Sequence, residues 1–215
     1  MIPIYAAGAA CVVRFVHRKP SGVMLMSKTK NILLAGVGGQ GIILAGQLLA
    51  EVLAAGGFDV KLSEVHGMAQ RGGSVVTQVR FGPRVYSPLV SPGEVDYLVA
   101  FEQIEAWRWL SWLRPGGRLI MDEQIIYPTG KTQISLPEGL TSRPGTICLN
   151  ARELAAQAGL VKAANMVLLG ALAAHLGLNL SIWHKVLADL VPAKYLEPNR
   201  KALEEGFARA KPSDA

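Results

Sequence analysis

The chain has 215 residues, half of them apolar and few of them aromatic, with a formal net charge of +6. A chain of this length can bury one aliphatic core without staples. Its two cysteines, Cys11 and Cys148, lie far apart, which excludes a disulfide framework and an iron–sulfur cluster ligated by this chain alone. No basic run with interleaved aromatic residues occurs, so we expect no nucleic-acid partner.

Other features of the composition favour a cytoplasmic protein. Low cysteine usage is typical of a reducing compartment. The four histidines follow no metal-ligand spacing, so no metal site is expected. Residues 31–50 and 163–183 are charge-free, but glycines, amides and a histidine interrupt them. Both stretches therefore indicate elements buried in a protein core and no membrane span.

Residues 1–27 are predicted to be an N-terminal extension without function. The apolar run 2–13 precedes the basic residues Arg14, Arg18 and Lys19, the reverse of the order in a secretory signal. The alternative is that this arm packs on a partner. Residues 28–215 are expected to form a single domain.

Strands and helices alternate along that domain. Short apolar or alternating runs predict strands at residues 31–35, 58–65, 74–81, 97–101, 118–121 and 146–149. Helical patterns cover residues 41–55, 103–113, 151–158, 163–176, 181–189 and 197–210. The order predicts an α/β fold with a doubly wound, mostly parallel, Rossmann-like sheet and a helical C-terminal portion.

A glycine loop follows the first predicted strand of the domain. Gly36, Gly38 and Gly41 satisfy the spacing G-x-G-x-x-G, which allows a tight turn, close approach to phosphate and close helix–strand packing. Backbone N–H groups at the start of the next helix favour an anion. Gly39 and Gln40 are unusual for an NAD loop. The alternative is a tight connection that binds nothing.

A second polar loop, residues 63–74, follows the second predicted strand and should lie at the same carboxyl edge. Glu64 is close to the position of a ribose-binding acid, although a solvated strand end is an equal alternative. His66 can exchange protons near neutral pH, and Arg71 suits phosphate or carboxylate. The alternative is a polar surface loop without a role.

Together the two loops resemble the beta subunits of indolepyruvate:ferredoxin oxidoreductases and, more broadly, the gamma-type domain of 2-oxoacid:ferredoxin oxidoreductases. The likeness covers about residues 30–207 and continues in residues 85–89, 113–117, 165–172 and 192–195. Other gamma-type chains tend to carry arginine at the position of Val37 and a different second loop. This difference favours the aryl-pyruvate branch of the family.

The resemblance implies a subunit, inactive alone, of an oxidoreductase that converts a 2-oxoacid to acyl-CoA and reduces ferredoxin. Thiamine diphosphate and the iron–sulfur clusters would belong to an alpha subunit, and coenzyme A would be a co-substrate. The alternatives are a gamma subunit for pyruvate or branched-chain 2-oxoacids, a stand-alone NAD(P)-binding oxidoreductase, or a non-catalytic nucleotide-binding regulator.

The candidate site residues are carried over from both loops. The catalytic candidates are Glu64, His66 and Arg71. The cofactor-binding candidates are Gly36, Gly38, Gly39, Gln40, Gly41, Gly67, Gln70, Gly72 and Gly73. The first loop's N–H groups are expected to face a phosphate of coenzyme A or of the neighbouring thiamine cofactor. Arg71 would neutralise that anion or hold the substrate carboxylate, and Glu64 or His66 would relay a proton or form hydrogen bonds.

Two further expectations concern residues outside the loops. Asn165 is expected to cap the helix that it opens, or to orient the loops. Trp107, Trp109 and Trp112 cannot all face one side of a helix. At least one of them is therefore expected at a protein interface.

Overall fold

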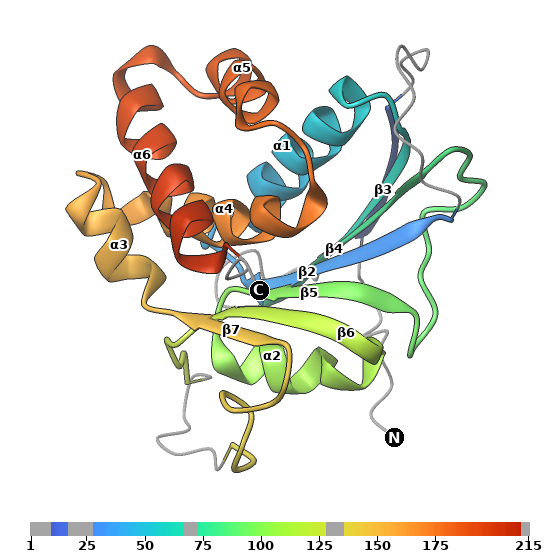
Figure 1. Cartoon of the computed structure of the whole chain (residues 1–215). Coiled ribbons are helices and arrows are strands. Elements are labelled where there is room, and N and C mark those ends of the chain that lie inside the picture. The colour runs from blue at the N-terminus through green and yellow to red at the C-terminus, as the bar shows by residue number, and fades with distance from the viewer. Residues whose placement is uncertain (1–9, 17–27, 67–72, 128–135, 212–215) are drawn as a thin grey trace.

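The computed structural model describes residues 10–16, 28–66, 73–127 and 136–211; for residues 10–16 and 66 it describes the backbone alone. Seven strands of this described part form one sheet in the order β1-β3-β4-β2-β5-β6-β7 (Figure 1). The strands are β1 (Ala10–Val16), β2 (Lys30–Val37), β3 (Asp59–His66), β4 (Ser74–Gly82), β5 (Val95–Ala100), β6 (Leu113–Asp122) and β7 (Thr146–Leu149).

The predicted α/β fold with a mostly parallel sheet is confirmed, with one strand placed differently. β2, β5, β6 and β7 are parallel neighbours, whereas β4 is antiparallel to both β2 and β3. β3 therefore points in the same direction as β2, but β4 separates the two strands. The reason is the short connection after His66, because a parallel pair would need a crossover of a dozen or more residues.

Helices cover both faces of the sheet (Figure 1). The upper face carries α1 (Ile42–Ala55), α3 (Ala151–Gln157), α4 (Ala164–Leu176), α5 (Leu180–Leu190) and α6 (Ala193–Ala210). The lower face carries α2 (Gln103–Trp109), which continues into a short 3-10 turn, Leu110–Trp112. A separate apolar core lies on each face, and this two-sided covering makes the sheet doubly wound.

The helical C-terminal portion is held together by a close crossing of α4 and α6. A Cβ added to Gly206 would lie 1.9 Å from the backbone oxygen of Val167, and one on Gly170 would lie 1.9 Å from that of Leu203. The two helices therefore touch backbone to backbone. In the part of the chain that the structure describes, no helix is long and apolar enough to span a bilayer.

Three expected elements have different bounds. The helix expected to reach residue 113 stops earlier, because Leu113 already pairs with Val95 in β6; the Pro-Gly-Gly segment that follows forms a register shift inside the strand. α6 begins before Pro198 and contains it. Residues 10–16, expected within the extension, form β1 and pair along β3. The domain boundary at residue 28 stays a prediction.

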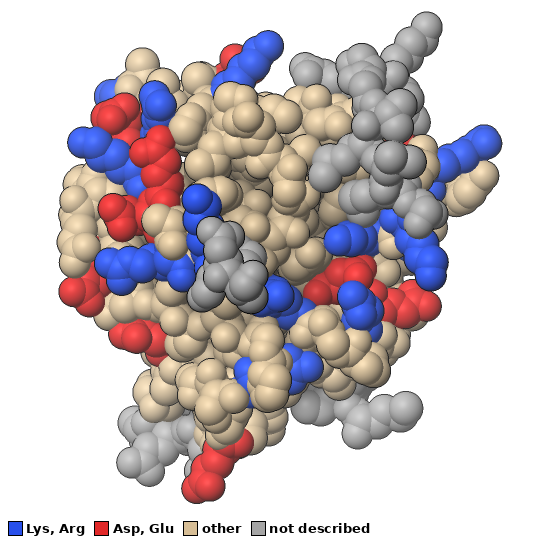
Figure 2. Space-filling view, viewed as in Figure 1, with Lys and Arg blue, Asp and Glu red and all other residues tan. Residues whose placement is uncertain are grey.

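The tryptophans divide between core and surface. Trp109 and Trp112 pack edge to face in the lower core, with ring centroids 5.1 Å apart, whereas Trp107 is 45 % exposed. On the face shown in Figure 2, basic and acidic side chains are interspersed, and no single-signed field covers it. An interface role for Trp107 stays a prediction.

Candidate anion-binding site

The glycine loop lies where the direction of the chain connections changes. From β2 the chain crosses the upper face through α1, whereas from β5 it crosses the lower face through α2 (Figure 1). β2 and β5 are parallel neighbours, with Ala35 paired to Ala100. Ligands of open α/β sheets bind in the crevice at the carboxyl ends of two such strands. Residues 36–41 and 101–103 lie at the carboxyl ends of β2 and β5, which is where this general rule places a ligand.

The glycines of the loop have different structural roles. A Cβ on Gly36 would lie 2.8 Å from Cβ of Phe101, so Gly36 permits close packing of the loop on β5. Gly39 and Gly41 have φ angles of 104° and 77°, which disfavour other residues. A Cβ on Gly41 would also lie 2.5 Å from Nδ2 of Asn165.

Gln40 is a brace between the loop and β5. Its Oε1 accepts the N–H of Val37 at 2.7 Å, and its Nε2 donates to the carbonyl oxygen of Phe101 at 2.7 Å. We predicted Gln40 as a ligand contact, but its side chain is bonded to backbone at both ends. This bracing explains why an amide suits the position.

The N–H groups left for an anion are fewer than the sequence predicted. The N–H of Gly38 donates to the carbonyl oxygen of Gly73 at 2.8 Å, and that of Val37 is used by Gln40. Within the described ranges, no acceptor bonds the amides of Gly39 and Gly41 or those of residues 42–44, and no side chain caps this 14-residue helix. An uncapped start of a long helix favours an anion through its free N–H groups and its dipole.

Asn165 lies beside this helix start. The expected cap is wrong, because the residue preceding α4 is Ala163 and no side chain of the described residues caps that helix. Instead, Nδ2 of Asn165 donates to the carbonyl oxygen of Gly41 at 3.4 Å. Its Oδ1 is buried without a hydrogen-bond partner among the described atoms. A buried, unpaired amide oxygen at this place is a group that a ligand can satisfy.

Glu64 does not occupy the position of a ribose-binding acid. It pairs with Thr77 of β4, which places its strand two strand spacings, or about 10 Å, from the glycine strand β2. A dinucleotide site takes this acid from the adjacent strand. Glu64 is also only 4 % exposed, so the solvated strand end is wrong as well. The geometry therefore weighs against the NAD(P) alternative.

The second loop begins at the predicted edge. His66 ends β3 and pairs with Val75, whereas Ser74 pairs with Val37 of the glycine strand, so both loops lie at one edge of the sheet. Gly67, Gln70, Arg71 and Gly72 lie outside the described residues. Gly73 is placed next to Gly38 by the backbone bond between them. The catalytic roles of Glu64, His66 and Arg71 stay predictions.

Buried carboxylates at the same edge were missed by the sequence reasoning. Glu102 is fully buried and caps α2 by accepting N–H bonds from Ile104 and Glu105, and it also accepts one from Ile126. Burial raises the pKa of Glu102 above its ordinary value. Acidic residues at the start of a helix, which the helix dipole favours, are the sequence signal that could have marked Glu102 and Glu105.

Asp122, at the end of β6, leads to a prediction of pH dependence. Its Oδ1 accepts the N–H groups of Gln124 and Ala151, and burial raises its pKa above the ordinary value of 3.8. A carboxyl whose pKa is raised on folding stabilises the fold below its unfolded pKa and loses that contribution as pH rises through the folded pKa. Asp122→Asn keeps the accepting oxygen without the charge. The stability of this variant relative to the unsubstituted protein should therefore improve as pH rises from about 4 to 7.

The measurement is urea unfolding of both proteins across that pH range. Asp189→Asn, at an exposed position, is the control for the removal of one carboxylate charge. A difference independent of pH for Asp122→Asn would contradict the prediction.

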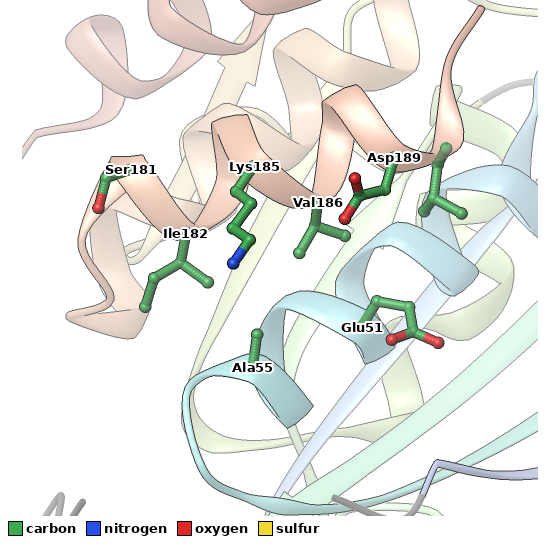
Figure 3. Close-up of a pocket in the computed structure, with 8 residues that line it drawn as sticks. Glu51, Ala55, Ser181, Ile182, Lys185, Val186 and Asp189 are labelled. Carbon is green, nitrogen blue, oxygen red and sulfur yellow. The ribbon is translucent and has the colours of Figure 1, made fainter. Parts of the chain in front are cut away.

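Two further features lie outside the crevice. A groove of about 570 Å³ separates α1 from α5 and is lined by Glu51, Ala55, Ser181, Ile182, Lys185, Val186, Asp189 and Leu190 (Figure 3). It lies along the C-terminal half of α1, whereas the glycine loop precedes the helix, so the groove is separate from the anion site. Among the described side chains, no group of three or more His, Cys, Asp or Glu could hold a metal ion.

Comparison with known proteins defines the class. The family model of pyruvate ferredoxin/flavodoxin oxidoreductase matches residues 31–209. The chain belongs to this family. The indolepyruvate oxidoreductase subunit IorB of Pyrococcus horikoshii is 37 % identical over 201 residues, which cover 86 % of this chain and 97 % of that protein. The corresponding subunit of Thermococcus kodakarensis is 36 % identical with the same coverage.

Solved structures agree with this placement. The gamma subunit of keto/oxoacid ferredoxin oxidoreductase from Geobacter sulfurreducens has a TM-score of 0.65 and 29 % identity, covering 84 % of this chain and 98 % of that one. The 2-oxoglutarate:ferredoxin oxidoreductase of Magnetococcus marinus, with 2-oxoglutarate, coenzyme A and succinyl-CoA bound, has a TM-score of 0.69 and 26 % identity. The match covers 88 % of this chain and 32 % of that longer chain.

Proposed function

We propose that the chain is the beta subunit of an indolepyruvate ferredoxin oxidoreductase and supplies an anion-binding crevice to the assembled enzyme. The enzyme decarboxylates an aryl 2-oxoacid oxidatively, transfers the acyl group to coenzyme A and passes the electrons to ferredoxin. Similarity to indolepyruvate oxidoreductase subunits over nearly their whole length supports this subunit over the pyruvate and branched-chain alternatives.

The main observation in support of this anion site is the uncapped start of α1, beside the carboxyl ends of β2 and β5. We assign the free N–H groups of Gly39, Gly41 and Ile42 to a phosphate of coenzyme A or of thiamine diphosphate held by the neighbouring subunit. Asn165, whose Oδ1 has no partner among the described atoms, would accept a hydrogen bond from the same ligand. The relative from Magnetococcus marinus, which binds coenzyme A, makes this co-substrate the first to test.

In this proposal the chain's own residues bind the anion and orient the substrate. Arg71 would pair with the anion or the substrate carboxylate, and His66 or Glu64 would hold a proton or a hydrogen bond near it. Thiamine diphosphate, when bound in an alpha subunit, supplies the decarboxylation chemistry, and the clusters of that subunit carry the electrons to ferredoxin. The assembled enzyme would act in the cytoplasm, without nucleic-acid or membrane contact.

Co-purification with the alpha subunit tests the assignment. The complex should reduce ferredoxin with indolepyruvate only when coenzyme A is present, and neither subunit should do so alone. Its kcat/KM should be at least about tenfold higher for indolepyruvate than for pyruvate or 2-oxoisovalerate, because a pocket for an aryl side chain binds small substrates weakly. Activity of the isolated chain with NAD(P) would overturn the proposal, and a preference for pyruvate would favour the gamma-subunit alternative.

A further inference from the structure

Glu105 of α2 is a buried carboxylate with contacts on three sides. It is 3 % exposed and lies on the lower face of the sheet, away from α1. Its Oε2 accepts the hydroxyl of Ser74 at 2.6 Å and the indole N–H of Trp109 at 3.1 Å. Its Oε1 lies 3.0 Å from Nε of Arg108. These contacts hold the carboxylate in one orientation, with the hydroxyl of β4 as its most distant partner along the sequence.

The bond to Ser74 continues into the glycine loop. Ser74 follows Gly73, whose carbonyl oxygen accepts the N–H of Gly38 at 2.8 Å. The contacts therefore run from Glu105 through Ser74 and Gly73 to Gly38. The next residue is Gly39, which has one of the free N–H groups. Gln40 holds the same loop from the side of β5. The loop is thus fastened from two sides, and Glu105 anchors the side that faces β4.

We propose that Glu105 is a positioning residue for the anion crevice, acting through Ser74. This inference rests on the proposed function of the crevice. A hydrogen bond to a buried carboxylate is short and strong, so it fixes Ser74 more firmly than a bond to a neutral group would. Gly73 has no side chain, so no side-chain contact of its own fixes its position. Without the bond, Gly73 is freer to move, and the Gly38 amide that it holds becomes free to turn with the loop.

Ser74→Ala and Glu105→Gln, singly and together, test this proposal in the reconstituted complex. Each single variant should raise KM for coenzyme A about tenfold with a smaller effect on kcat, because the loop loses its binding geometry. The double variant should be no worse than Ser74→Ala alone, since Glu105→Gln only weakens the hydrogen bond that Ser74→Ala removes. Ser74→Thr, which keeps the hydroxyl, should have the same KM for coenzyme A as the unsubstituted protein. Arg108→Gln removes only a half-exposed ion pair to the same carboxylate and should leave KM unchanged.

Amide hydrogen exchange of residues 36–41 in the full chain provides a readout independent of activity. Exchange should become faster in Ser74→Ala and Glu105→Gln and remain unchanged in Arg108→Gln. Unchanged exchange, or additive effects on KM, would overturn the inference. Faster exchange with unchanged KM would also overturn it, because the loop would then have no part in binding. Inactivity of the unsubstituted complex would count against the proposed function, while exchange would still decide whether Glu105 holds the loop.

Discussion

A Gly206→Ala variant should lose about 3 kcal/mol or more of its free energy of unfolding. The added Cβ would lie 1.9 Å from the backbone oxygen of Val167, and the obstacle at Gly170 is also backbone, that of Leu203. Backbone atoms within a helix cannot rotate away, so α4 and α6 must move apart. Their separation would open gaps around fully buried side chains such as Leu203 and Val167, with loss of packing on both helices.

The sign of the effect makes this a sharp test. Replacing glycine by alanine within a helix usually stabilises it by about 1 kcal/mol through backbone entropy alone. The crossing predicts the opposite sign, visible as a melting temperature lower by about 10 °C. Glu205→Ala, at the neighbouring exposed position, is the control and should change stability by less than about 0.5 kcal/mol. A Gly206→Ala protein as stable as the unsubstituted one would show that the helices are further apart.

A Gly41→Ala variant should lower kcat/KM of the assembled complex about a hundredfold. Alanine at a φ of 77° is strained by about 1 kcal/mol, and its Cβ would meet Nδ2 of Asn165 at 2.5 Å. Relief of this clash displaces either Asn165 or the first turn of α1, and both belong to the proposed anion crevice. A displacement of about 1 Å in a binding geometry can cost two orders of magnitude in rate.

Gly93→Ala is the matched control for Gly41→Ala. Its φ of 79° is nearly the same, but nothing lies within 4 Å of the added Cβ. It should therefore carry a similar backbone strain without the collision, and it should show no loss of kcat/KM. Combining Gly41→Ala with Asn165→Ala removes the obstructing amide and should partly restore activity if the collision is the cause. Full activity of Gly41→Ala alone would remove the start of α1 from the site.

Local patterns were sufficient for most elements of the fold. The alternating residues of β4 and the apolar run of β2 were identified from the sequence because burial on a sheet face repeats every second residue. Their bounds in the structure, Lys30–Val37 and Ser74–Gly82, lie within a few residues of those expected. The direction of β4 was not recognised, although the short connection before Ser74 already favoured an antiparallel pair.

The arrangement of the anion site could not be predicted from the sequence, because it depends on contacts between segments that are far apart in the chain. Asn165 meets Gly41 across 124 residues, and Ser74 meets Glu105 across 31. No periodicity relates such positions, so a single sequence marks the residues without pairing them. Gln40 shows the same limit, because its sequence position suggested a ligand contact whereas its two backbone bonds make it a brace.

The sequence by itself determined the α/β class, the order of its elements and the two loops by which the family is identified, because these follow from local periodicity and from glycine spacing. Only the tertiary structure decided which N–H groups of the glycine loop remain free. It also decided that Glu64 is buried two strands from β2, and that Glu105 supports the loop from the opposite face. The physical reason is that a backbone amide pairs with the acceptor that folding brings to it, and for Gly38 that acceptor is the carbonyl oxygen of Gly73, far away in the chain.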